Sequence, residues 1–115
     1  DPRNRRRWTR LPVSVKVRGR WRSPSGEEGE LEALLGWISE GGAQLRTAAP
    51  IGANSLVRMT IKLSLFQSVE VTGRVRWWRR RGEVREAGIE FSEPQRKVGE
   101  WVERQIAKAA SEPKG

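Results

Sequence analysis

The sequence predicts a mainly β fold, a six-stranded antiparallel barrel followed by one amphipathic α-helix. Two observations support this prediction: several runs alternate apolar and polar residues, and the period changes to that of a helix near the C-terminus. The length of 115 residues is that of one ordinary domain, and we expect residues 1–110 to form it. Its parts are a flexible arginine-rich arm at 1–10, the barrel at 11–91 and the helix at 93–110, before a disordered tail at 111–115.

The clearest strand lies in residues 56–65, where odd positions are apolar and even positions from Arg58 to Ser64 are polar. A period of two is typical of a strand with one buried face. Similar patterns predict further strands at 13–17, 30–39, 43–46, 69–77 and 87–91. Residues 34–38 are apolar on both faces, so the register of that strand stays open.

Short segments rich in glycine, proline, serine or charge separate the strands at 23–26, 41–42, 49–52 and 79–82. Segments of this length are typical of antiparallel hairpins. A closed barrel or a sandwich of about six strands fits this spacing. We expect Arg79–Arg81 to form a solvated hairpin tip.

The final segment has the period of an amphipathic helix. Its inner face is expected to consist of Val98, Trp101, Val102, Gln105, Ile106 and Ala109. Ser92 is the predicted N-cap, with Gln95 as its capping-box partner. Because the polar face carries both signs of charge, we expect the helix to pack on the barrel rather than on a membrane.

The composition excludes several classes of function. The chain has no cysteine and no histidine, so it lacks disulfides, thiolate nucleophiles and the commonest metal ligands and general bases. We therefore expect no enzyme activity, no metal and no cofactor. No apolar run has the length of a membrane span and no signal peptide is visible, which predicts a cytoplasmic protein without membrane insertion. The net charge of +9 favours a phosphate-bearing, nucleic-acid or acidic partner.

The first candidate binding motif is the N-terminal arm, in which five of the first ten residues are arginine. Arg6 and Arg10 stand four apart, and Arg5 and Arg7 flank Arg6. A guanidinium fork matches O6 and N7 of guanine and can also stack on the base. The arm is therefore a candidate site for a guanine nucleotide, and a solvated arm that binds polyanions loosely is the alternative.

The second candidate motif is the segment 37–43, where a strand end carries Ser39 and is followed by Gly41 and Gly42. Glycines let a ligand approach the backbone closely, and the hydroxyl can donate to a phosphate or a base edge. An ordinary Gly-Gly hairpin is the alternative interpretation.

Taken together, the two motifs resemble the signature of the PilZ domain, a bacterial receptor module for cyclic di-GMP. The R-x-x-x-R motif of that family is matched by Arg6 and Arg10, and its [D/N]-x-S-x-x-G motif by Ser39 and Gly42. The late strands of the family resemble the segments 73–77 and 87–91. The resemblance implies a PilZ-type barrel that binds cyclic di-GMP, singly or as an intercalated dimer, and signals to a downstream protein or an attached domain.

One position departs from the family pattern, because Trp37 stands where the family places Asp or Asn, two residues before the serine. In the family that side chain is expected to accept hydrogen bonds from N1 and N2 of guanine. An indole only donates, so the loss would cost roughly 1.5–3 kcal/mol unless Trp37 stacks on a base. Trp77 either lines the same site or belongs to the core, and its phase with Val71 and Val75 favours the core.

Three functions stand as hypotheses. The first is a cyclic di-GMP receptor whose ligand-binding residues are Arg5, Arg6, Arg7, Arg10, Trp37, Ser39, Gly41, Gly42 and Trp77. The second is a divergent PilZ adaptor that binds a protein and has lost or weakened nucleotide binding because of Trp37. The third is a nucleic-acid-binding module that places the arm and Arg79–Arg81 on phosphates and stacks Trp8 or Trp78 on bases.

Overall fold

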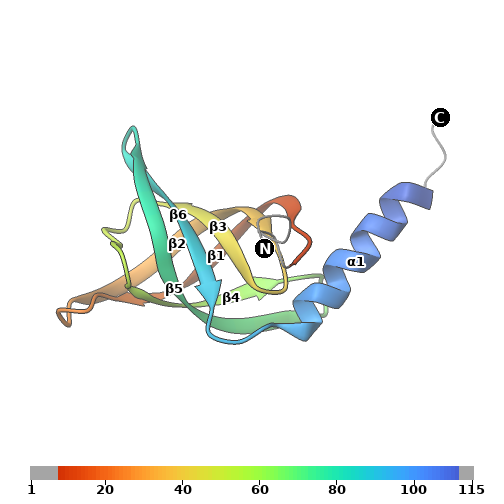
Figure 1. Cartoon of the computed structure of the whole chain (residues 1–115), viewed down its shortest axis with the longest axis horizontal. Helices are drawn as coiled ribbons and strands as arrows, with labels where there is room; N and C mark the ends of the chain where they lie inside the picture. Colours follow the sequence, from red (N-terminus) through yellow and green to blue (C-terminus); the bar gives the residue numbers. More distant parts are fainter. Residues whose placement is uncertain (1–7, 112–115) are drawn as a thin grey trace, which may run out of the picture.

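The computed structural model of the chain describes residues 8–111 and confirms the predicted barrel and C-terminal helix (Figure 1). Six antiparallel strands close in the order β1–β2–β3–β6–β5–β4. The strands are β1 (Leu11–Arg22), β2 (Glu28–Ile38), β3 (Gly42–Thr47), β4 (Leu56–Lys62), β5 (Ser68–Arg81) and β6 (Val84–Phe91). The helix α1 spans Arg96–Ser111. Pairing of β1 with β4 closes the barrel, so each strand has two neighbours.

Parts of the predicted arm and tail lie outside the described residues. Arg5, Arg6 and Arg7 belong to residues 1–7, and most of the predicted tail belongs to 112–115. Arg10 is described and directly precedes β1. Ser111 is the last residue of α1, so its assignment to the tail is wrong.

Alternate side chains from the six strands fill the barrel. Leu35, Leu45 and Val75 are completely buried, and Trp21 packs over Gly29 of the neighbouring strand. Burying a side chain of this size contributes about 1.5–3 kcal/mol relative to leaving it exposed. The packed interior holds the outer faces of the strands in fixed positions, including the face that carries the candidate site.

A register shift in β2 explains why residues 34–38 are apolar on both faces. The pairing with β3 shifts between Leu35 and Trp37. Leu35 and Ile38 are three residues apart, yet both are buried in the core. Trp37 pairs with Gln44, and both line the outer side of the barrel.

A second register shift lies in β5, between Val75 and Trp77. An extra residue in one strand turns the side chains that follow to the other face of the sheet. Val75 is completely buried, whereas Trp77 is 42% exposed. The prediction that Trp77 belongs to the core is wrong, because its phase with Val75 ends at this bulge.

The hairpin between β4 and β5 places two apolar side chains in solvent. β4 ends at Lys62, so the strand predicted over 56–65 is too long. The N–H of Leu63 closes a short turn on the carbonyl of Gln67 (2.8 Å). Leu65 and Phe66 stand at the tip of this turn and are 82% and 97% exposed.

Arg79–Arg81 do not form the predicted hairpin tip. They continue β5 and pair with residues 84–86 of β6. The turn lies instead at Gly82, whose positive φ of 64° is one that glycine adopts readily. The three arginines therefore lie along a strand edge of the barrel wall rather than in a loop.

The helix α1 begins at Arg96, three residues later than predicted. The N–H of Gly99 donates to the carbonyl of Gln95 (3.0 Å), so the first helical hydrogen bond starts at Gln95. Ser92 is not the N-cap, because its own N–H donates to the carbonyl of Thr72 (2.8 Å) and extends the β5–β6 pairing.

Only the first half of α1 is seated on the barrel. Val98 and Val102 are buried and Trp101 packs against the core, whereas Ile106 is 37% exposed. Figure 1 shows α1 leaving one end of the barrel and extending away from it. The predicted inner face is therefore too long, since Ile106 and Ala109 lie beyond the core. No helix within the described residues is long and apolar enough to cross a membrane.

Candidate functional site

The turn between β2 and β3 is organised by Ser39. Its N–H donates to the carbonyl of Gly42 (2.8 Å), and its Oγ accepts from the N–H groups of Gly41 (3.2 Å) and Gly42 (3.1 Å). The residue is only 4% exposed. The hydroxyl therefore shapes the backbone that the two glycines present on the surface.

Both glycines of this turn are in close contact with a neighbouring group that leaves no room for a Cβ, and neither has a positive φ. A Cβ on Gly41 would overlap the Trp8 indole, and a Cβ on Gly42 would overlap the carbonyl oxygen of Ile89. The half-buried Trp8 therefore lies directly on the Ser39–Gly42 turn. This contact brings the two sequence motifs together at the end of the arm.

The outer face of four adjacent strands forms the floor of the candidate site. One row across β2, β3, β6 and β5 consists of Trp37, Gln44, Gly88 and Trp77. The Trp77 indole lies against Gly88, where a Cβ would overlap the ring. The row thus has an indole at each end, with Gln44 and the glycine at 88 between them.

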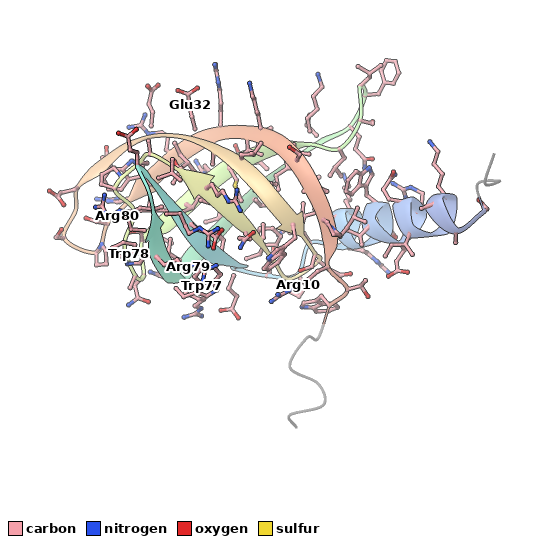
Figure 2. All side chains as sticks on the ribbon, turned by 90° about the horizontal axis from the view of Figure 1, so that it is seen from above. Arg10, Glu32, Trp77, Trp78, Arg79 and Arg80 are labelled. Carbon is pink, nitrogen blue, oxygen red and sulfur yellow. The ribbon has the colours of Figure 1, made fainter. Side chains whose placement is uncertain are left out.

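A pocket of about 550 Å³ lies over this floor. Its lining includes every predicted site residue that the structure describes, namely Arg10, Trp37, Ser39, Gly41, Gly42 and Trp77. Figure 2 shows Arg10 and Trp77 on the same side of the barrel, opposite Glu32. Arg5, Arg6 and Arg7 lie outside the described residues.

Arg10 is placed at the pocket by Trp37. Its guanidinium carbon lies 3.9 Å from the centre of the Trp37 ring, which is the geometry of a cation–π contact. The indole that replaces the family's Asp or Asn thus packs against an arginine of the R-x-x-x-R motif.

The prediction missed Arg76 and Glu90, which also line the pocket. Arg76 Nε donates to Glu90 Oε1 at 2.6 Å, and both side chains are about half exposed (56% each). The alternation in residues 87–91 could have identified Glu90, because it places Glu90 on the outer face with Gly88. Arg76 could not have been placed, because it lies at the bulge in β5.

An ion-pair cluster lies one row further along the same outer face. Glu86 is 2% exposed and accepts hydrogen bonds from Arg79 Nε (2.7 Å) and Arg46 Nε (3.2 Å). The hydrogen bond from Arg79 lowers the pKa of Glu86 more than burial raises it, and Arg46 adds to the lowering. The ionised carboxylate thus holds two half-exposed guanidinium groups beside Trp77, and Arg79 lies 5.9 Å from that ring centre.

The Ser39–Gly42 turn also contacts the start of α1. The N–H of Gln95 donates to the carbonyl of Glu40 (2.8 Å). The Glu40 side chain packs against Gly99, where a Cβ would overlap the carboxylate. A second pocket, of about 800 Å³, lies beside this contact and is lined by Trp8, Glu40 and residues of α1. One turn therefore touches the candidate site on one side and the helix on the other.

A family model, described as PilZ domain, matches residues 4–108 of the chain. The chain belongs to the PilZ family. The match runs from the arm to α1, so it covers Arg6, Arg10, the Ser39–Gly42 turn and most of the helix. No curated protein sequence matches the chain.

Several solved structures resemble this PilZ domain in fold. The inhibitor of motility MotI/DgrA of Bacillus subtilis has a TM-score of 0.71 and 21% identity, with 91% of this chain and 52% of that chain covered. The PilZ domain of Escherichia coli YcgR with c-di-GMP has a TM-score of 0.65 and 14% identity, with 96% of this chain and 100% of that chain covered. The K. pneumonia MrkH–c-di-GMP complex has a TM-score of 0.63 and 18% identity, with 93% of this chain and 53% of that chain covered. The chain thus spans about half the length of MotI and MrkH.

Proposed function

We propose that this PilZ domain is a non-catalytic receptor that binds cyclic di-GMP in the pocket between Trp37 and Trp77. The observation that supports this most strongly is the convergence of Arg10 and the Ser39–Gly42 turn on one pocket. These are the described parts of two family motifs that lie far apart in the sequence. A volume of about 550 Å³ is within the range of small-molecule sites, roughly 300–1,000 Å³.

The proposed roles follow from the chemistry of the lining. Arg10, with Arg6, reads the O6 and N7 edge of guanine and neutralises phosphate, and Arg5 and Arg7 assist. Trp37 and Trp77 supply flat apolar faces on which bases stack. The Ser39–Gly42 turn forms a wall of the site, with its two glycines in close contact with Trp8 and the Ile89 carbonyl.

The proposed output is a change in the arm. Binding through Arg5–Arg7 would hold residues 1–7 against the barrel, and the ligand must offset the entropy of that ordering. The closed surface of barrel and arm is then what a downstream protein or an attached domain recognises in the cytoplasm. Two neighbours of similar fold, YcgR and MrkH, were solved with c-di-GMP, which supports this ligand class.

Isothermal titration calorimetry of cyclic di-GMP into the purified chain tests the proposal, with GTP and cyclic AMP as specificity controls. We expect saturable binding that is selective for cyclic di-GMP. The stoichiometry separates one ligand from a stacked pair.

Arg10→Ala should weaken binding by about 10- to 100-fold, because a charge-assisted contact contributes roughly 1.5–3 kcal/mol. Arg18→Ala is a matched control, since Arg18 lies outside the pocket lining, pairs with Glu32 (3.5 Å) and has a side chain that is 86% exposed. Equal affinities for wild type and the Arg6→Ala, Arg10→Ala double variant would contradict the proposal.

A protein-binding adaptor is the second candidate function, and the exposed tip of the β4–β5 hairpin favours it. Leu65 and Phe66 are almost fully exposed neighbours, and adjacent exposed apolar side chains are common at protein-binding sites. An adaptor without nucleotide binding predicts no heat with cyclic di-GMP and no displacement of a fluorescent analogue. The same calorimetry therefore decides between the two functions.

A further inference from the structure

Guanine recognition in this pocket lacks one partner at the position where the family pattern places it. The N1–H and N2–H groups of guanine are donors and need an acceptor, and a carboxylate suits them best. The Trp37 indole is a donor only and is packed against Arg10. A guanine-selective site would therefore need its acceptor from another residue of the lining.

Glu90 occupies a suitable position on the floor. It pairs with Gly42 across β3 and β6, and Gly42 in turn is hydrogen-bonded to Ser39. Adjacent strands lie about 4.8 Å apart, so Ser39 and Glu90 are separated by roughly 10 Å. The residue of β3 that pairs with Glu90 is a glycine, so β3 itself places no side chain between the Glu90 carboxylate and the signature serine.

Arg76 fixes the Glu90 carboxylate and leaves it able to accept hydrogen bonds from a ligand. Both Nε and Nη2 of Arg76 contact the same oxygen, Oε1 of Glu90. A carboxylate offers about four acceptor sites over its two oxygens, so sites remain for a ligand. Glu93 also lines the pocket, but it lies in the exposed segment before α1 rather than on a strand.

We propose that Glu90 accepts the N1–H and N2–H hydrogen bonds of guanine in place of the Asp or Asn that Trp37 has replaced. Arg76 acts as a positioning residue that fixes the carboxylate. This role rests on the proposed function, because it assigns a specificity residue within the same pocket.

Whether neutralising a carboxylate of the pocket weakens or strengthens ligand binding shows whether that carboxylate is an acceptor or a bystander. A carboxylate beside a ligand with two phosphates opposes binding unless it makes a direct hydrogen bond. Removing the charge of a bystander therefore strengthens binding, whereas removing the charge of an acceptor weakens it. Glu93→Gln is the matched control, because Glu93 carries the same charge in the same pocket.

The experiment combines Glu90→Gln with a ligand that lacks the exocyclic amino group. Calorimetry measures the affinities of wild type, Glu90→Gln and Glu93→Gln for cyclic di-GMP and for cyclic di-IMP, and circular dichroism verifies the fold of each variant. We expect Glu90→Gln to bind cyclic di-GMP about 10- to 100-fold more weakly. We also expect the preference of wild type for cyclic di-GMP over cyclic di-IMP to shrink in Glu90→Gln and to persist in Glu93→Gln.

The outcomes distinguish a failure of the Glu90 role from a failure of the receptor function. Binding by wild type with an unchanged or stronger affinity in Glu90→Gln, or with an unchanged ligand preference, overturns the role of Glu90 and leaves the receptor function standing. An absence of binding by wild type overturns both.

Discussion

Glu86 is the residue of the outer face whose charge contributes most clearly to stability. Its carboxylate is 2% exposed and is covered by Arg46 and Arg79, which are 51% and 59% exposed. Ion pairs between exposed groups contribute little, but a covered carboxylate that loses its charge leaves two guanidinium groups without a partner. The cluster therefore joins β3, β6 and β5 beside the pocket.

Glu86→Gln should lower the free energy of unfolding by about 1–2 kcal/mol at pH 7, in the lower part of the range for charged hydrogen bonds because the arginines are half exposed. The pKa of Glu86 is lowered from its ordinary value of 4.5, so its charge stabilises the folded state above that pH. This contribution is lost as the pH falls below 4.5 towards the folded pKa. Urea unfolding at pH 7, 5.5, 4.5 and 3.5 measures the difference between wild type and variant.

Glu70→Gln is the control for this pH series. Glu70 pairs with Arg58 at 4.0 Å, and both side chains are more than 60% exposed. Its effect should stay below about 1 kcal/mol at every pH. A wild-type to Glu86→Gln difference that does not shrink towards pH 3.5 would show that packing, not charge, is responsible.

At the scale of the elements, strands were predictable wherever side chains alternate without interruption. The apolar positions 57, 59 and 61 identify the core face of β4, and 71 and 75 identify that of β5. Alternation could not reveal the bulges, because an extra residue changes the phase without changing composition. For that reason Trp77 was placed in the core and Arg79–Arg81 in a turn.

Gly19 on β1 lies directly against the backbone of β4. A Cβ there would overlap the carbonyl oxygen of Arg58 and lie 2.7 Å from the Cα of Met59. Both are backbone atoms, so no side-chain rotation relieves the overlap. Gly19→Ala should therefore destabilise the barrel by about 1–3 kcal/mol or more, measured by chemical unfolding.

Gly52→Ala is the control for this substitution, because the nearest heavy atom to its added Cβ is Trp78 Nε1 at 4.0 Å. The change should be within about 0.5 kcal/mol of wild type. Equal stability of Gly19→Ala and Gly52→Ala would mean that the β1–β4 contact adapts more easily than the structure indicates.

At the scale of the whole molecule, the net charge attracts anions without selecting among them. The net charge of +9 attracts any polyanion, so weak binding of nucleic acid by itself distinguishes nothing. Affinity for cyclic di-GMP, with two phosphates, should fall by no more than about tenfold between 50 and 200 mM salt. A nucleic-acid module with 6–10 phosphate contacts would lose about 10³–10⁵ in affinity over the same range, and titrations at both salt concentrations separate the two.

The candidate site was predictable only in part, because some of its residues are far apart in the sequence. The resemblance to PilZ domains named Arg10, Ser39 and Gly42, and the structure brings these three to one pocket. Arg76 and Glu90 lie 34 and 48 residues after Gly42 in the sequence, and the pairing of β3 with β6 and of β6 with β5 brings them to the same pocket. The local alternation assigns Glu90 to the outer face, but only this non-local pairing places it beside Gly42.

The seat of α1 has a mechanical consequence. The helix has 16 residues and is therefore about 24 Å long, yet only its first two turns are buried. Because Val98 and Val102 are held in the core, the helix tilts only together with its seat, which includes the hydrogen bond from Gln95 to Glu40 in the turn that borders the pocket. A rotation of this seat by about 10° would move Ser111 through about 4 Å, because Ser111 lies at the far end of the helix. Strain too small to deform the barrel would thus become a movement on the scale of an atom's diameter at the far end of the helix.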